Sequence, residues 1–270
     1  MNRILESPND GHVHITKRCL GTGRSALDLL ADMDSTGVGR AAVVTPSTLG
    51  WDNTLTFDAV AEHPTRFVPI ARVDLRADDG IDELRDVVKR GAVGIRITTF
   101  GEADLGWLTE GRMREVAAVL AADSIVAEFH CEPEQLISVG RFASLHPDVR
   151  VLVDHLGRPV PGEQGGVAQR TFLELADLPN VFAKSPDLGF FSGGEYPYSD
   201  MAPFITAAID RFGADRVVWS SDWPQTQDEG EYRLSLDGML AAIEHRTDAE
   251  RTAVLSGTFT RLFGNPSSKA

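Results

Sequence analysis

Close to its N-terminus the chain carries two histidines whose type and spacing could do chemistry. They are His12 and His14, in the segment Asp10-Gly11-His12-Val13-His14. Residues two apart in an extended strand point to the same face, so both imidazoles would project side by side. Such a pair can bind a metal ion or polarise a substrate carbonyl. The triplet alone is a weak signal, because close histidines also occur by chance, and it needs partners from later in the chain.

Side chains that bind protons, metals or anions recur where later apolar runs end. They are Arg72, Arg96, Glu128, His130, His155, Lys184 and Asp222. Buried strands that are otherwise rich in valine and isoleucine have no structural need of such groups. Any one of them could form a satisfied salt bridge, but their repeated placement at strand ends favours a shared catalytic pocket.

Eight apolar runs alternate with segments of helical spacing, and this alternation predicts the fold. The runs cover residues 10–14, 41–44, 67–73, 93–97, 125–130, 149–155, 181–184 and 216–222. Alternating strands and helices imply parallel βαβ units, and eight units in about 250 residues indicate a (β/α)8 TIM barrel. We expect one such domain over residues 1–270. A doubly wound open sheet is the alternative, but Gly21-Thr22-Gly23 is a lone GxG without a third glycine in register.

The loops that follow the predicted strands are longer than those that precede them. Residues 98–110, 157–166, 185–200 and 223–231 form these long connections. TIM barrels build their sites from the loops at this end of the strands. The 185–200 loop carries Phe190, Phe191, Tyr196 and Tyr198 among glycines, which favours a lid over the substrate rather than a disordered insertion.

Composition narrows the class of protein. The formal net charge of −14 argues against nucleic acid and against anionic membranes as partners, although a local group of cations could still bind a small anionic substrate. No segment approaches the roughly 18 apolar residues of a membrane span. Cys19 and Cys131 form no CxxC pair, which favours a reducing cytoplasm, and we expect Cys131 to be a buried apolar residue. A homo-oligomer is compatible with these residues, which do not decide it.

Three segments together resemble the amidohydrolase-2 (amidohydrolase-related) family. They are His12-Val13-His14, Val153-Asp154-His155-Leu156-Gly157-Arg158-Pro159 and Trp219-Ser220-Ser221-Asp222-Trp223-Pro224. The second and third are most similar to the branch of 2-pyrone-4,6-dicarboxylate lactonase and sugar-acid lactonases. The resemblance spans the chain and implies a (β/α)8 barrel in which His12, His14, His155 and Asp222 converge.

The resemblance also implies two versions of the chemistry. In most of the superfamily these residues bind one or two divalent metal ions, and Zn²⁺ is the first candidate for a single site here. In the pyrone lactonase branch the reaction can proceed without metal, with histidines polarising the lactone carbonyl and an aspartate deprotonating water. Arg96 matches a substrate arginine of that branch by position. A binuclear centre is not expected, because no strand-end lysine is obviously placed as a carboxylated bridging ligand.

The sequence therefore predicts a hydrolase that opens a carboxylated lactone, with Asp222 as general base. Arg96, supported by Arg72 or Lys184, would hold the substrate carboxylate, and His130 and Tyr196 are further candidates for substrate contact. The alternatives are a metal-dependent non-oxidative decarboxylase, a lactone isomerase, and a sugar-acid binding protein without catalytic activity.

Overall fold

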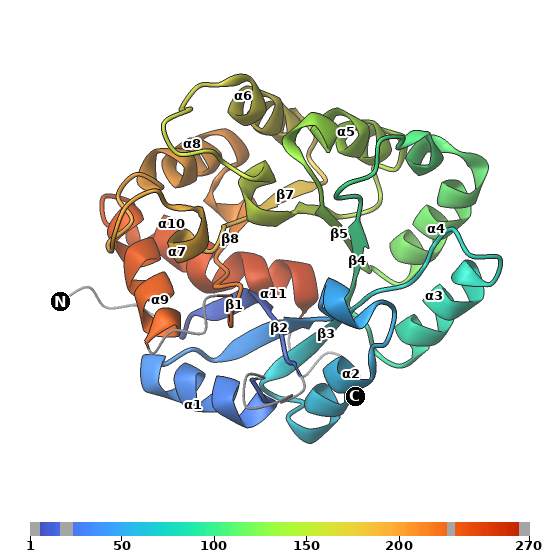
Figure 1. Ribbon diagram of the computed structural model, residues 1–270, viewed down its shortest axis with the longest axis horizontal. Coiled ribbons are helices and arrows are strands. Elements are labelled where there is room, and N and C mark those ends of the chain that lie inside the picture. Colours follow the sequence, from blue (N-terminus) through green and yellow to red (C-terminus); the bar gives the residue numbers. More distant parts are fainter. Residues whose placement is uncertain (1–5, 17–23, 226–229, 265–270) are drawn as a thin grey trace.

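The computed structural model describes residues 6–16, 24–225 and 230–264. Within them, eight parallel strands follow one another around a nearly closed barrel in the order in which they occur in the chain (Figure 1). The strands are β1 (Asn9–Val13), β2 (Arg40–Val44), β3 (Phe67–Ala71), β4 (Gly94–Thr98), β5 (Val126–His130), β6 (Val151–Val153), β7 (Val181–Lys184) and β8 (Val217–Val218). The predicted (β/α)8 barrel is confirmed.

Helices surround the barrel: most lie between successive strands, and α9, α10 and α11 follow β8 (Figure 1). They are α1 (Ala26–Thr36), α2 (Thr54–Glu62), α3 (Gly80–Lys89), α4 (Gly111–Ala122), α5 (Leu136–Leu145), α6 (Val167–Glu174), α7 (Leu188–Phe191), α8 (Ala202–Phe212), α9 (Glu231–Ala242), α10 (Asp248–Thr252) and α11 (Thr258–Phe263). None of the helices in these ranges is long and apolar enough to cross a membrane.

The barrel closes where β1 meets the segment that follows β8. Gly11 N–H donates to Trp219 O at 2.9 Å, and Asp222 N–H donates to His12 O at 3.0 Å. A Cβ atom on Gly11 would lie only 2.9 Å from Trp219 O, so a glycine is needed for this close approach. The seam therefore places His12 of β1, and His14 just after it, directly beside Asp222.

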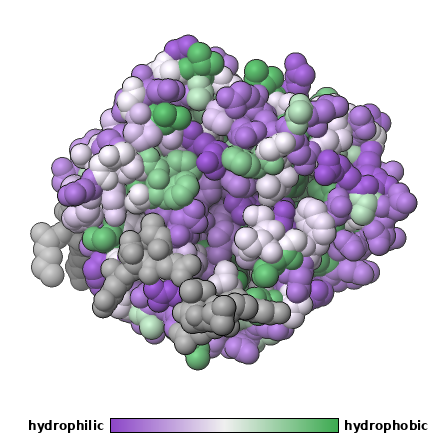
Figure 2. Space-filling model, in the orientation of Figure 1, coloured by the Kyte–Doolittle hydropathy of each residue, from purple (hydrophilic) through white to green (hydrophobic). Residues whose placement is uncertain are grey.

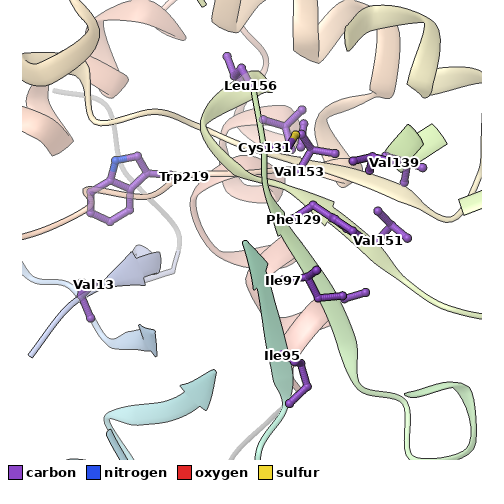
Figure 3. Packing of buried hydrophobic residues seen from close by; sticks show 14 of the residues in the cluster. Val13, Ile95, Ile97, Phe129, Cys131, Val139, Val151, Val153, Leu156 and Trp219 are labelled. Atoms are coloured by element: carbon purple, nitrogen blue, oxygen red, sulfur yellow. The ribbon is translucent and has the colours of Figure 1, made fainter. Parts of the chain in front are cut away.

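Apolar side chains fill the barrel at the end where the strands begin. Helix α11 lies across that end, seen behind the strands in Figure 1, and its Phe259, Leu262 and Phe263 pack against the inward-facing residues. Those residues include Ala42, Val44, Val68, Ile70, Val126, Leu152, Phe182 and Val218. The other face of each strand packs under the helices, as Ile97, Phe129 and Val151 do in Figure 3.

Polar residues replace the apolar ones further along the same strands. On β5, Val126 belongs to the apolar floor, whereas Glu128 is a wholly buried carboxylate two residues later. His130 comes two residues after that and lines a cavity at the mouth. Alternate residues of a strand face the same side. Successive inward-facing residues of β5 therefore lie in the apolar floor, in the buried polar layer above it, and at the mouth of the barrel.

Three strands end at least two residues earlier than the sequence predicts, namely β3 at Ala71, β6 at Val153 and β8 at Val218. Strand β6 ends at Val153, and residues Asp154–Gly157 form a helical turn in which His155 has a φ of 52°. After the two-residue β8, Asp222 has a φ of 58°. Such values are strained for residues other than glycine and concentrate at functional sites, where they redirect a side chain.

Other differences concern helices. Helix α10 continues through a π-helical turn, Ala253–Gly257, into α11. The 185–200 loop contains the short helix α7. The expectations for Cys19 and for Gly21-Thr22-Gly23 lie outside the described residues.

Candidate active site

Three potential ligand atoms, from the end of β1, from the residue after it and from the segment after β8, form a triangle at the barrel mouth. The Nε2 atoms of His12 and His14 lie 3.1 Å apart. Asp222 Oδ1 lies 3.4 Å from His12 Nε2 and 3.5 Å from His14 Nε2. His155 Nε2 lies 3.7 Å from the other oxygen of Asp222, Oδ2. The structure thus brings together the four residues predicted to form the centre.

The triangle fits a divalent metal ion. Ligand atoms about 2.0–2.1 Å from a tetrahedral Zn²⁺ are about 3.3 Å from one another, which agrees with the three distances above. Asp222 Oδ1 is buried and accepts no hydrogen bond from any described residue. The donor set of two imidazole nitrogens and one carboxylate oxygen is typical of zinc sites that keep an open position for water or substrate.

The protonation state of His14 leaves its Nε2 atom able to bind a metal ion. Its Nδ1 lies 2.7 Å from Val44 O, so this nitrogen donates and leaves the lone pair on Nε2. Burial, together with the charge of Arg96, lowers the pKa of His14 to about 3. His14 is therefore neutral at physiological pH, which a metal ligand or a carbonyl-binding group requires.

A network of buried charges lies directly beneath the triangle. Lys184 Nζ is 2.7 Å from Glu128 Oε1 and 3.0 Å from Asp154 Oδ1, and Arg96 Nε is 3.1 Å from Asp154 Oδ2. Burial and the charge of Asp154 raise the pKa of Glu128 to about 7. Burial alone would raise the pKa of Asp154, but Lys184 and Arg96 lower it well below its usual range.

A second group of potential metal ligands belongs to this network. It comprises His12, Glu128 and Asp154, all buried. Lys184 Nζ lies within 3.0 Å of both carboxylates and 2.8 Å from His12 Nδ1. The side-chain ammonium group of Lys184 thus already occupies the space between these three residues. The geometry therefore favours one metal ion rather than two.

Asp10 connects the two segments that carry the triangle. Its Oδ1 accepts hydrogen bonds from the backbone N–H groups of His12 and Ser221, both at 3.0 Å, and its Oδ2 accepts from Ser221 Oγ at 2.5 Å. Burial raises the pKa of Asp10 to about 6, although these hydrogen bonds oppose the shift. A single buried carboxyl group thus fixes His12 and the residue before Asp222 relative to each other.

Above the triangle lies a cavity of about 180 Å³. We call it the reaction chamber. Its polar walls are His14, Ser47, Arg96, His130, His155, Arg158, Asp222 and Gln225, and Phe190 and Phe191 of α7 border it. In Figure 2 a hydrophilic hollow opens at the barrel mouth, beside a hydrophobic patch in the region of α7. The chamber has the size and lining of a site for a small polar molecule.

Arg158 lines the reaction chamber, although it was not among the residues predicted to contact the substrate. Its guanidinium group stacks 4.8 Å from the ring centre of Phe100 and 5.4 Å from that of Phe191. The φ of Arg158 is 65°, so the turn after β6 directs this side chain back over the mouth. The signal that could have identified it is a cation three residues after His155 in the predicted mouth loop.

Three residues that were predicted to contact the substrate lie outside the lining of the reaction chamber. Lys184 is fully buried among carboxylates, so its charge is neutralised beneath the chamber and is not presented to a substrate. Arg72 stacks 4.6 Å from the Trp51 ring centre and donates to Gly50 O. Tyr196 is about half exposed and packs edge-on against Tyr198. None of the three borders the reaction chamber, whereas Arg96 and His130 do.

Cys131 is a buried residue, as expected from the sequence. It is 2% exposed and packs beside Val153 in the apolar cluster (Figure 3). Burial raises the pKa of its thiol to about 12, so it remains protonated and is not an activated nucleophile.

Comparisons with known proteins agree with this geometry. The 4-sulfomuconolactone hydrolase of Hydrogenophaga intermedia is 28% identical over 235 residues, which are 84% of this chain and 75% of that protein. The L-fucono-1,5-lactonase of Burkholderia ambifaria is 25% identical over 207 residues, which are 76% of this chain and 71% of that protein.

Solved structures share the fold. An amidohydrolase of Burkholderia multivorans with bound zinc superposes with a TM-score of 0.83 at 22% identity, covering 97% of this chain and 100% of that one. Residues 11–264 match the amidohydrolase family model, a range that contains His12, His14, His155 and Asp222. The chain therefore belongs to the amidohydrolase family.

Proposed function

We propose that this protein is a hydrolase that opens a lactone bearing an acidic group. One observation carries the proposal. The Asp222 carboxylate lies among His12, His14 and His155, while Arg96 and Arg158 line the same chamber. The two curated relatives described above, which act on lactones by their names, support it.

The triangle would hold one Zn²⁺ through His12, His14 and Asp222, and His155 lies beside it. When bound, the ion would polarise the lactone carbonyl and make a water molecule more acidic. The zinc-bound relative supports this assignment. The residues also suit carbonyl activation by hydrogen bonds from the histidines alone.

Asp222 is the group that moves the proton. Burial raises the pKa of Asp222 well above the usual aspartate value, and a cation held at Oδ1 would favour the carboxylate form that accepts a proton. Asp222 takes a proton from water as the water oxygen attacks the carbonyl carbon. When the bond between the acyl carbon and the ring oxygen breaks, the same carboxyl group returns that proton to the departing alkoxide.

Neutral histidines at the mouth stabilise the charge that develops on the carbonyl oxygen. Burial lowers the pKa of His130 to about 4 and that of His155 well below its usual value. Each ring therefore carries one N–H that it can donate without first losing or gaining charge.

Two arginines set the preference for an acidic substrate. Arg96 is held from below by Asp154, and Arg158 is held between two aromatic rings. A carboxylate or sulfonate between them would receive charge-assisted hydrogen bonds in a chain whose net charge is otherwise −14.

The test is a turnover assay with a panel of carboxylated, sulfonated and neutral lactones under a pH indicator, run after zinc loading and after chelation. Asp222→Asn should lower kcat by about 10²- to 10⁴-fold. Asp215→Asn, the same change at an exposed ion pair with Arg261, is the matched control and should leave kcat unchanged. Equal turnover by Asp222→Asn and the unmodified protein would contradict the proposal.

The same assay distinguishes the alternative reactions. A decarboxylase would release carbon dioxide, and a lactone isomerase would return a lactone of the same mass. NMR spectroscopy of the products separates both from the hydroxy acid that ring opening produces.

A further inference from the structure

A second chamber opens onto the reaction chamber at the barrel mouth. It has a volume of about 400 Å³, compared with about 180 Å³ for the reaction chamber. The two share Arg158, Phe190 and Phe191 as walls. We call the larger space the outer chamber. A molecule held at Asp222 could therefore continue past these three residues without leaving the protein surface.

Several of the large apolar side chains that the protein exposes gather around the outer chamber. Phe100 is 46% exposed, Phe190 50% and Val160 43%. Three of the nine exposed large hydrophobic residues among those described thus border this one space. Prolines 159 and 161 add further apolar surface. Clustered exposed apolar side chains beside a site mark a ligand-binding surface, because covering them removes apolar area from water.

The charges around the outer chamber disfavour a second acidic group. Glu132 and Glu134 line it on the side of the loop after β5. Arg158 is the one cation among its lining residues, and the reaction chamber shares it. An anion in the outer chamber would face two carboxylates without a cation of its own, so an uncharged group is preferred there.

We propose that the substrate carries an uncharged apolar substituent, aryl or short alkyl, which lies in the outer chamber while its lactone ring and acidic group occupy the reaction chamber. This inference rests on the lactone hydrolase function proposed above. It adds that this enzyme selects lactones larger than its reaction chamber alone would hold.

Three lactones test the inference. They share one carboxylated lactone ring and carry, at the same position away from the carboxylate, hydrogen, a phenyl group or a carboxyphenyl group. The phenyl lactone should exceed the parent in kcat/KM by at least tenfold, mainly through a lower KM. The carboxyphenyl lactone should lose that advantage.

Substitutions in the outer chamber test whether the preference for the phenyl lactone arises there. Val160→Glu places a charge on the outer chamber and should abolish the preference for phenyl while leaving the parent lactone unaffected. Val167→Glu is the matched control, since Val167 is more exposed and lies on α6 away from the chamber lining. Glu134→Lys should raise kcat/KM for the carboxyphenyl lactone about tenfold.

The outcomes separate the two proposals. Hydrolysis of the parent without a phenyl preference, or a preference that persists in Val160→Glu, overturns the inference and leaves the lactone hydrolase function intact. Failure to hydrolyse any of the three, and any of the wider panel, overturns both.

Discussion

Glu128 Oε1 lies 3.3 Å from Nδ1 of His12, beneath the triangle of His12, His14 and Asp222. The inner nitrogen of His12 therefore contacts a buried ion network, while its outer nitrogen faces His14 and Asp222. A ligating histidine donates its inner N–H to such an acceptor, which fixes the orientation of the ring, and Lys184 Nζ lies 2.7 Å from the same carboxylate oxygen. The network thus positions the site in addition to neutralising Glu128 and Asp154.

We expect Lys184→Met to destabilise the fold strongly. Removal of the ammonium leaves two buried carboxylates without their shared cation, and breaking a buried pair costs about 3–5 kcal/mol. Urea unfolding measures the loss. Lys89→Met removes an exposed i,i+3 pair with Asp86 and should change stability by less than about 1 kcal/mol. Equal midpoints for the two variants would show that the network contributes nothing to stability.

The protein should bind one zinc ion per chain. The triangle offers one set of ligands, and Lys184 occupies the centre of the second. Elemental analysis after zinc loading and dialysis measures the ratio. His14→Ala should reduce it to near zero, whereas His63→Ala, which alters a histidine packed against Phe67, should not. Two ions per chain would contradict the role of Lys184 as the resident cation.

Loss of the Arg158 charge should weaken binding of acidic lactones. A hydrogen bond to a charged group contributes about 1.5–3 kcal/mol, so Arg158→Leu should raise KM about 10- to 100-fold for a carboxylated lactone. Arg158→Lys should restore part of the affinity. Arg85→Leu on the exposed face of α3 is the control. A similar rise in KM for a neutral lactone would indicate a change of shape rather than lost charge pairing.

Asp187 should make stability depend on pH. It accepts hydrogen bonds from Gly189 and Phe190 at the start of α7, and burial together with the charge of Glu231 raises its pKa to about 7 from an ordinary value of 3.8. The folded chain therefore binds the proton more tightly than the unfolded chain. The resulting stability is complete below about pH 4 and is lost as the pH rises to about 7.

Asp187→Asn should remove this dependence, since an amide oxygen can still accept the two backbone hydrogen bonds. Between pH 5 and pH 8 the unmodified protein should lose about 2–3 kcal/mol more stability than the variant. Urea titrations across that range measure the difference, with Asp58→Asn on the exposed face of α2 as control. Parallel pH profiles for Asp187→Asn and the unmodified protein would exclude the effect.

The barrel and the converging histidines could be predicted because a strand repeats every two residues. That period carries Val126, Glu128 and His130 from floor to mouth, and it applies equally to β1 and β4. The polar residues at the strand ends were visible because apolar strands do not need them.

Other features depend on geometry that a local pattern does not contain. Lys184 ends β7 and is enclosed beneath the site, whereas Arg96 in the middle of β4 reaches the chamber. Their depth follows from the tilt and stagger of strands around the barrel, not from position along one strand. The position of Arg158 depends on a turn with positive φ at His155, a conformation that is uncommon for any residue other than glycine and that the strand pattern does not specify.

The close approach of Gly11 to Trp219 has a consequence for how the protein becomes active during synthesis. Asp10 and Ser221, which hold the two ligand-bearing segments together, are 211 residues apart in the chain. Strand β1 therefore leaves the ribosome long before its closing partner exists. A fragment that ends before Asp222 cannot form the triangle of His12, His14 and Asp222. The ability to bind a metal ion at this triangle would therefore arise only when the barrel closes, and not in an early folding step.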